Sequence, residues 1–134
     1  MEPRLTVITL GVEDVDRSLA FYRDGLGFPV LERFGEFICF ELNGFALALY
    51  PREAHAEGAN LDPETTGTGD VSLAHNVRTR EEVDELVAEA EAAGATITEP
   101  PGETDWGGYS AYFTDPDGHC WEIAAGAELF EQFI

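Results

Sequence analysis

The apolar residues of this chain fall into two successive sets of short segments, and each set predicts strand, helix, strand, strand, strand. In the first set, alternating and β-branched residues at 5–12 predict a strand. Apolar residues then recur at helical spacing from Val15 to Leu26, with Asp14 or Asp16 as the N-cap. Three further strands are predicted at 28–34, 37–42 and 45–50.

The second set repeats this order. A strand at 71–77 precedes a helix at 80–93, which has Thr79 as its N-cap, Glu82 in the capping-box position and Gly94 at its end. A loop is predicted at 99–108, and the remaining strands are predicted at 95–98, 109–114 and 119–124.

Two turn signals support the repeat. Asn43-Gly44 lies between the last two predicted strands of the first set, and Asp115-Pro116-Asp117-Gly118 lies between those of the second. A repeated βαβββ module predicts an α+β fold in which two modules form a half-open curved barrel with the helices outside. The concave inner face of such a barrel provides a ligand cavity.

The chain length of 134 residues suits a single domain built from these modules. We expect module 1 at about 1–52, a linker at about 53–69 that is rich in Gly, Pro, Thr and acids, and module 2 at about 70–126. The tail at 127–134 is apolar enough to dock on the body or on a partner subunit, and we expect a homodimer.

The charge balance narrows the range of partners. Seven basic residues, all arginine, stand against 27 acidic ones, which gives a formal net charge of −20. Such a surface repels nucleic acids and anionic membranes, favours cationic ligands and suits a salt-rich cytoplasm. The sequence shows neither a signal-peptide pattern nor an apolar run of membrane-spanning length, so we expect a cytoplasmic protein with Cys39 and Cys120 as reduced thiols.

The motifs at both ends of the repeat resemble those of the vicinal oxygen chelate superfamily, which includes glyoxalase I, bleomycin-resistance proteins and extradiol dioxygenases. The resemblance rests on residues 12–22 (VEDVDRSLAFY), on 26–28 (LGF), on 113–118 (FTDPDG) and on Glu122. It covers essentially the whole chain, and it implies the two-module fold. It does not select one activity, because this fold hosts many.

Metal-dependent members place a ligand on the first and last strand of each module. By the resemblance, these positions fall on Val7, Ala48, Ser72 and Glu122. Valine and alanine have no donor atom and serine is a weak donor, whereas zinc, nickel or iron needs about three or four strong protein ligands. We therefore predict no metal and no other cofactor.

The three histidines do not complete a metal site. Strand alternation places His75 on the face opposite Ser72, toward the helix layer or an interface. Strand alternation likewise places His119 on the face opposite Glu122. His55 in the linker is expected to be solvated.

Strand alternation also gives the predicted lining of the ligand cavity. Glu122 shares its predicted face with Cys120, and Tyr112 is a neighbour on the preceding strand. The other predicted ligand-binding residues are Thr9, Ser72, Asn76 and Trp106. Asn76 either contacts the ligand or caps a strand end, and Trp106 either stacks on a planar or cationic ligand or covers the sheet end.

Three functions are compatible with this pattern. The first is a metal-free small-molecule-binding protein of the bleomycin-resistance type, with a cationic or aromatic ligand. The second is a metal-dependent lyase or isomerase of the glyoxalase I type that uses Glu122. The third is metal-free acid/base catalysis by Glu122, assisted by Tyr112 or Cys120. We favour the first, because the metal-ligand positions other than Glu122 carry poor donors or none.

Overall fold

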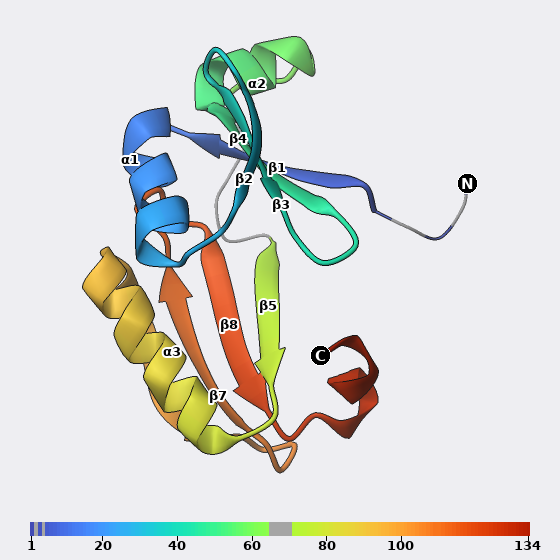
Figure 1. Cartoon of the computed structure of the whole chain (residues 1–134), viewed down its shortest axis with the longest axis vertical. Helices are drawn as coiled ribbons and strands as arrows, with labels where there is room; N and C mark the ends of the chain where they lie inside the picture. The colour runs from blue at the N-terminus through green and yellow to red at the C-terminus, as the bar shows by residue number, and fades with distance from the viewer. Residues whose placement is uncertain (2, 4, 65–70) are drawn as a thin grey trace. The chain divides into compact units, whose positions relative to one another are not determined.

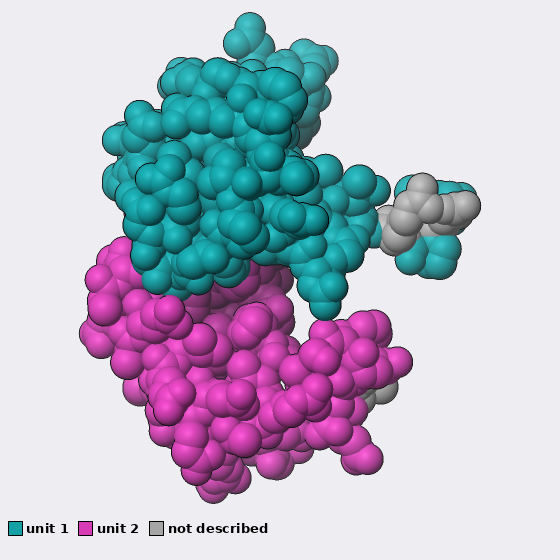
Figure 2. Space-filling model, in the orientation of Figure 1, with its two compact units in different colours: residues 1–67 teal, residues 68–134 magenta. Residues whose placement is uncertain are grey.

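The computed structural model describes residue 1, residue 3, residues 5–64 and residues 71–134 (Figure 1). The chain divides into two compact units, Met1–Gly67 and Thr68–Ile134, which Figure 2 shows in different colours. Each unit contains its own sheet and its own helices.

The first unit follows the predicted order and then adds a helix. Among its described residues, four strands form a mixed sheet in the order β1-β4-β3-β2, with β1 parallel to β4 and the other pairs antiparallel. Its elements are β1 (Val7–Val12), α1 (Val15–Leu19), the π-helical turn η1 (Ala20–Gly25), β2 (Val30–Phe34), β3 (Phe37–Glu41), β4 (Ala46–Pro51) and α2 (Arg52–Gly58).

The α1 helix covers one face of this sheet. Asp14 is its N-cap, because the side chain accepts a hydrogen bond of 3.0 Å from the backbone N–H of Arg17. The buried Tyr22 ring packs against the rings of Phe28 and Phe40, with centroids 5.8 and 5.9 Å away. These aromatic contacts join the helical segment to the buried side chains of β3.

The α2 helix lies where the sequence predicted a linker. The segment from Arg52 to Glu57 consists of good helix formers apart from His55. Pro51 directly before the helix has a fixed φ, and its backbone is extended at the start of the helix. A Cβ atom on Gly11 would lie 3.3 Å from the Arg52 Cα, so the helix begins against β1. The helix was not predicted because the polar composition of the segment is typical of a linker. The part of the predicted linker at 65–70 lies outside the described residues.

The second unit contains the repeat of this arrangement. Its described residues form a four-stranded mixed sheet in the order β5-β8-β7-β6, with β5 parallel to β8 and the other pairs antiparallel. Its elements are β5 (Ser72–Val77), α3 (Arg80–Ala93), β6 (Thr96–Glu103), β7 (Tyr109–Thr114), β8 (Cys120–Ala125) and the 3-10 helix η2 (Glu128–Phe133).

The α3 helix matches its prediction at both ends. Thr79 and Glu82 form the capping box, and Gly94 ends the helix in the left-handed conformation with φ 111°. Backbone hydrogen bonding from Thr79 lowers the pKa of the Glu82 carboxyl below its ordinary value. The buried face of α3 carries Val83 and Val87, while its acidic residues are exposed.

The β6 strand is longer than predicted and includes the segment assigned to a loop. Two register shifts against β7 accommodate Pro100 and Pro101, which cannot donate to a regular ladder. β6 is an edge strand of the sheet, where such irregularities cost least.

The predicted α+β fold of two βαβββ modules is confirmed. Both predicted hairpin turns are present, with Gly44 and Gly118 at φ 92° and 87°. In the tail, Phe130 and Phe133 are exposed, and Arg78 Nη2 donates a hydrogen bond of 3.3 Å to the carbonyl of Ile134. Within the described segments, no helix is long and apolar enough to cross a membrane.

Candidate functional site

One face of the second sheet gathers most of the predicted site residues. Residues that are directly paired across strands point to the same face. Glu122 is paired with Ala74 on one side and Tyr112 on the other, and Cys120 is paired with Ser72. We call this surface the Glu122 face; its members on β5, β7 and β8 are Ser72, Ala74, Asn76, Ser110, Tyr112, Thr114, Cys120, Glu122 and Ala124.

The opposite face of the same sheet is the core. Phe113 and Trp121 are buried there, with their rings stacked at a centroid distance of 6.3 Å. Tyr109 also points to this side, because its hydroxyl donates a hydrogen bond of 2.9 Å to Asp84 on α3. This bond to the carboxylate raises the pKa of the Tyr109 hydroxyl above its ordinary value. Since α3 occupies this side, the Glu122 face is the side of the sheet that α3 leaves uncovered.

Tyr112 and Glu122 form the polar centre of the Glu122 face. The two residues are directly opposite each other on β7 and β8, so their side chains lie on the same face. Hydrogen bonding to the Glu122 carboxylate is the main cause that raises the pKa of the Tyr112 hydroxyl; desolvation and the charge of Glu122 add to it. The hydroxyl therefore keeps its proton to a higher pH than an ordinary tyrosine does.

The chemistry of this pair defines what it can bind. A carboxylate has two oxygens and about four acceptor positions for hydrogen bonds. Among the described residues of the Glu122 face there is no arginine to neutralise the charge. The pair thus offers hydrogen-bond acceptors and negative charge to any group that reaches it, and favours a cationic donor.

Replacing Glu122 by glutamine should lower the pKa of Tyr112 toward the ordinary tyrosine value of about 10. In the native protein the folded state holds the Tyr112 proton more tightly than the unfolded state. The stabilisation from this bond is therefore present below pH ~10 and is lost as the pH rises through the folded pKa. NMR titration of ring-labelled tyrosine measures the pKa of Tyr112 in both proteins, with Tyr109 as the internal control. If Tyr112 titrates equally in both proteins, Glu122 does not interact with its hydroxyl.

Trp106 is positioned by a neighbouring glycine. A Cβ atom on Gly108 would overlap the indole ring, at 1.8 Å from its Cζ3 atom, so the ring lies directly over Gly108. Since Tyr109 points toward α3, strand alternation directs position 108 toward the side of the Glu122 face. Trp106 remains 52% exposed. Its ring therefore does not serve as core, and one side is open to solvent.

The other predicted site residues lie in the first unit. Thr9 is half-buried on β1 and pairs with Ala48 on β4, and Cys39 on β3 pairs with the same alanine. Ala48 is fully buried and Cys39 is buried, whereas Val7 is exposed. The first unit thus presents no carboxylate at the position that corresponds to Glu122.

The metal positions implied by the fold do not fit a metal ion. Val7 and Ala48 carry no donor atom, and Ser72 offers only a weak neutral one. Across the part of the chain that the structure describes, no three His, Cys, Asp or Glu side chains come together as a ligand group. We derive no chemical step through a metal at Glu122.

The histidines are placed by local structure. His75 pairs with Ile123 on the core side of β5, as predicted, but it remains exposed at the sheet edge. The backbone N–H of His119 donates to the Asp115 carboxylate within the turn, at 2.8 Å. We expected His55 to be solvated; in the structure the residue is half-buried and its Nδ1 atom is buried, because α2 occupies the place of the expected linker.

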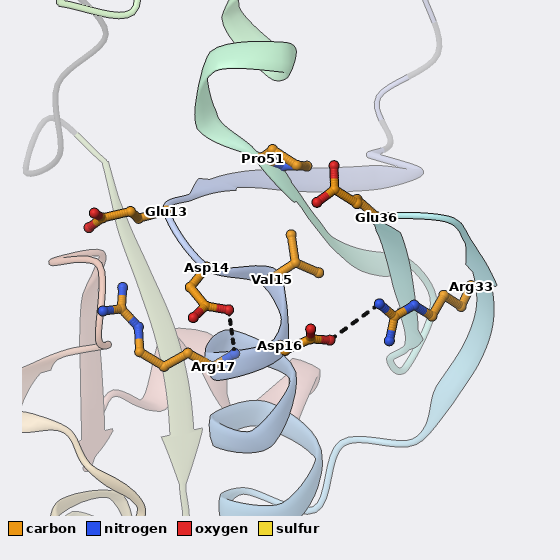
Figure 3. Close-up of a pocket in the computed structure, with 8 residues that line it drawn as sticks. All are labelled: Glu13, Asp14, Val15, Asp16, Arg17, Arg33, Glu36 and Pro51. Carbon is orange, nitrogen blue, oxygen red and sulfur yellow. Dashed lines mark hydrogen bonds and ion pairs between the residues drawn. The ribbon is translucent and has the colours of Figure 1, made fainter.

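A polar pocket of about 420 Å³ lies at the start of α1 (Figure 3). Its charged side chains take part in local structure, since Asp14 caps α1 and Asp16 pairs with Arg33 at 3.2 Å. It is lined by Glu13, Asp14, Val15, Asp16, Arg17, Arg33, Glu36 and Pro51. No sequence motif predicted this pocket, because it forms between α1 and the β2–β3 hairpin.

Comparison with known proteins agrees with this architecture. Residues 4–123 match the family described as the Glyoxalase/Bleomycin resistance protein/Dioxygenase superfamily. A crystal structure of a glyoxalase-related enzyme from Fulvimarina pelagi is 38% identical, with a TM-score of 0.85 over 92% of this chain and 88% of the other. A family enzyme from Burkholderia phytofirmans is 29% identical, with a TM-score of 0.79 over 90% and 96% of the two chains.

A curated relative from Bacillus subtilis, the uncharacterized protein YraH, is 28% identical over 90% of this chain and 96% of its own length. The family match covers nearly the whole sequence, and the Fulvimarina pelagi structure shares both fold and sequence with it. This chain belongs to the glyoxalase/bleomycin resistance protein/dioxygenase superfamily.

Proposed function

We propose that this chain is a small-molecule-binding protein of the glyoxalase/bleomycin-resistance type that uses Glu122 as a direct ligand anchor, without a metal. The observation that carries the proposal is the direct pairing of Tyr112 with Glu122 on a sheet face that α3 leaves uncovered, where Glu122 raises the pKa of the Tyr112 hydroxyl. At the other three positions where metal-dependent members have ligands, this chain has Val7, Ala48 and Ser72. The glutamate is thus retained as an acceptor, and its role is recognition.

The ligand that fits is cationic, aromatic or both. A protonated amine or amidine supplies the donors that the Glu122 carboxylate accepts, and the net charge of −20 attracts such ligands over a longer range. The open ring of Trp106 supports an aromatic or cationic group by stacking. Ser72, Asn76 and Cys120 on the same face are the further residues that we propose to line the site.

Titration of the metal-stripped protein with benzamidine, a planar cation, tests the proposal. We expect Glu122→Gln to weaken binding about ten-fold or more, which corresponds to about 1.4 kcal/mol. Calorimetry gives the affinity, and quenching of the emission from the exposed Trp106 reports on the site, since the other tryptophan, Trp121, is 7% exposed.

The matched control is Glu89→Gln on the solvent-exposed side of α3. It removes the same charge from a helix that lies on the opposite side of the sheet from the Glu122 face. Benzamide is the neutral counterpart of benzamidine, so its affinity shows how much of the binding comes from the aromatic ring alone. If Glu122→Gln and Glu89→Gln bind benzamidine equally well, Glu122 is not the anchor and the proposal fails.

A second candidate is metal-free acid/base catalysis. The Tyr112–Glu122 pair combines a proton donor with a carboxylate, and the Fulvimarina pelagi relative is described as a glyoxalase-related enzyme. In this role Glu122 removes a proton from the bound molecule. Exchange of substrate protons with deuterated solvent that depends on Glu122 would favour catalysis over simple binding.

We further propose a cytoplasmic homodimer. The exposed side chains of Phe130 and Phe133 support a partner subunit, because contiguous exposed apolar groups mark interaction surfaces. The free thiols Cys39 and Cys120 suit a reducing compartment.

A further inference from the structure

A β-bulge in β6 turns a second carboxylate toward the Glu122 face. Ile97 pairs with Phe113, and the next paired residue, Glu99, pairs with Tyr112, so Thr98 and Glu99 together oppose Tyr112. In a regular strand Glu99 would share the face of Ile97, which is the α3 side. The bulge breaks this alternation, and bulges near functional sites commonly redirect a side chain in this way.

Glu99 therefore extends a row of side chains that crosses the whole sheet. The row is Glu99 on β6, Tyr112 on β7, Glu122 on β8 and Ala74 on β5. Two strand spacings separate the backbones of Glu99 and Glu122, which amounts to about 10 Å. Tyr112 lies between the two carboxylates in this row, and each carboxylate has about four acceptor positions for hydrogen bonds.

The surroundings of Glu99 leave this carboxylate available. The residue is exposed, and neither a hydrogen bond nor an ion pair joins its side chain to another described residue. Pro100 follows it and restricts the backbone, which fixes the bulge and hence the direction of the side chain. Glu99 thus places an exposed carboxylate in line with Tyr112 and Glu122.

We propose that Glu99 is a second ligand-binding carboxylate, and that the Glu122 face selects ligands with two cationic groups joined by an apolar spacer. This inference rests on the proposed function, because Glu122 binds the first cation. Glu99 binds the second, and the ring of Tyr112 contacts the spacer between them. The chemical class is a linear or arylalkyl diamine whose charges are separated by up to the distance between the two carboxylates.

A matched pair of probes tests the second carboxylate. Hexylamine carries one charge and hexamethylenediamine carries two on the same chain, and both are titrated calorimetrically into the native protein and into Glu99→Gln, Glu122→Gln and Glu89→Gln. We expect the native protein to bind the diamine about ten-fold more tightly than the monoamine. In Glu99→Gln this preference should fall to about two-fold, with monoamine binding unchanged.

The control and the two glutamate variants separate the possible failures. Glu89→Gln removes the same charge from α3 and should keep the full preference for the diamine. If Glu99→Gln also keeps it, the second subsite is refuted while the binding role of Glu122 stands. If Glu122→Gln leaves monoamine binding unchanged, the proposed function itself fails and this inference fails with it.

Discussion

Replacing Phe40 by alanine should lower the free energy of unfolding by about 3–5 kcal/mol, the usual range for removing a buried phenylalanine side chain. Phe40 is 0% exposed on β3, and its ring contacts the rings of Tyr22 and Phe28. The substitution leaves a cavity where the helical segment meets the sheet. Guanidinium denaturation monitored by circular dichroism measures the change.

Phe34→Ala provides the matched control, because the same side chain is removed from the adjacent strand β2. Phe34 is 69% exposed, and we expect a change within about 0.5 kcal/mol. If the two variants lose similar stability, the assignment of Phe40 to the core and of Phe34 to the surface is wrong.

Asp115→Ala should cost roughly 3 kcal/mol of unfolding free energy. The Asp115 side chain is 3% exposed, and one of its oxygens accepts hydrogen bonds from the backbone N–H groups of Asp117 and His119, at 2.9 and 2.8 Å. Alanine leaves both donors without this acceptor, and bonds to a charged group are worth about 1.5–3 kcal/mol each. Thermal and chemical unfolding measure the loss.

Two further variants show whether the Asp115 side chain acts through these bonds. Asp115→Asn retains an acceptor oxygen and should lose only about half as much stability as alanine. Asp105→Ala, in the exposed loop before β7, should lose almost none. An Asp115→Ala variant as stable as Asp105→Ala would show that the carboxylate does not hold the turn, and the placement of Glu122 that depends on this turn would need revision.

The sequence predicted best those elements in which several signals agree. For α3, the apolar spacing, the Thr79–Glu82 capping box and the stop at Gly94 all indicate the same boundaries, and the structure has them. For α2, the helix-forming residues stand among Pro, Gly and acidic residues, and this composition is typical of a linker. No helical apolar stripe revealed it.

The same reasoning explains what could be predicted about the site. The turn at Asp115–Gly118 fixes the register of β7 against β8, so the sequence could predict Tyr112 as a neighbour of Glu122, and the structure pairs the two residues directly. Glu99 could not be found in this way, because it lies beyond a β-bulge and next to two prolines that predicted a loop. A bulge adds one residue to the count, and strand alternation then gives the wrong face.

We propose that Glu122 contacts the ligand itself and does not hold a metal. The direct pairing of Tyr112 with Glu122 and the lack of a donor atom at Val7 and Ala48 support this role. The most direct test is a crystal structure of the protein grown with benzamidine in the presence of zinc, nickel and manganese ions. We expect the amidinium within hydrogen-bonding distance of the Glu122 carboxylate, with no metal bound there. A metal ion coordinated by Glu122 would contradict it.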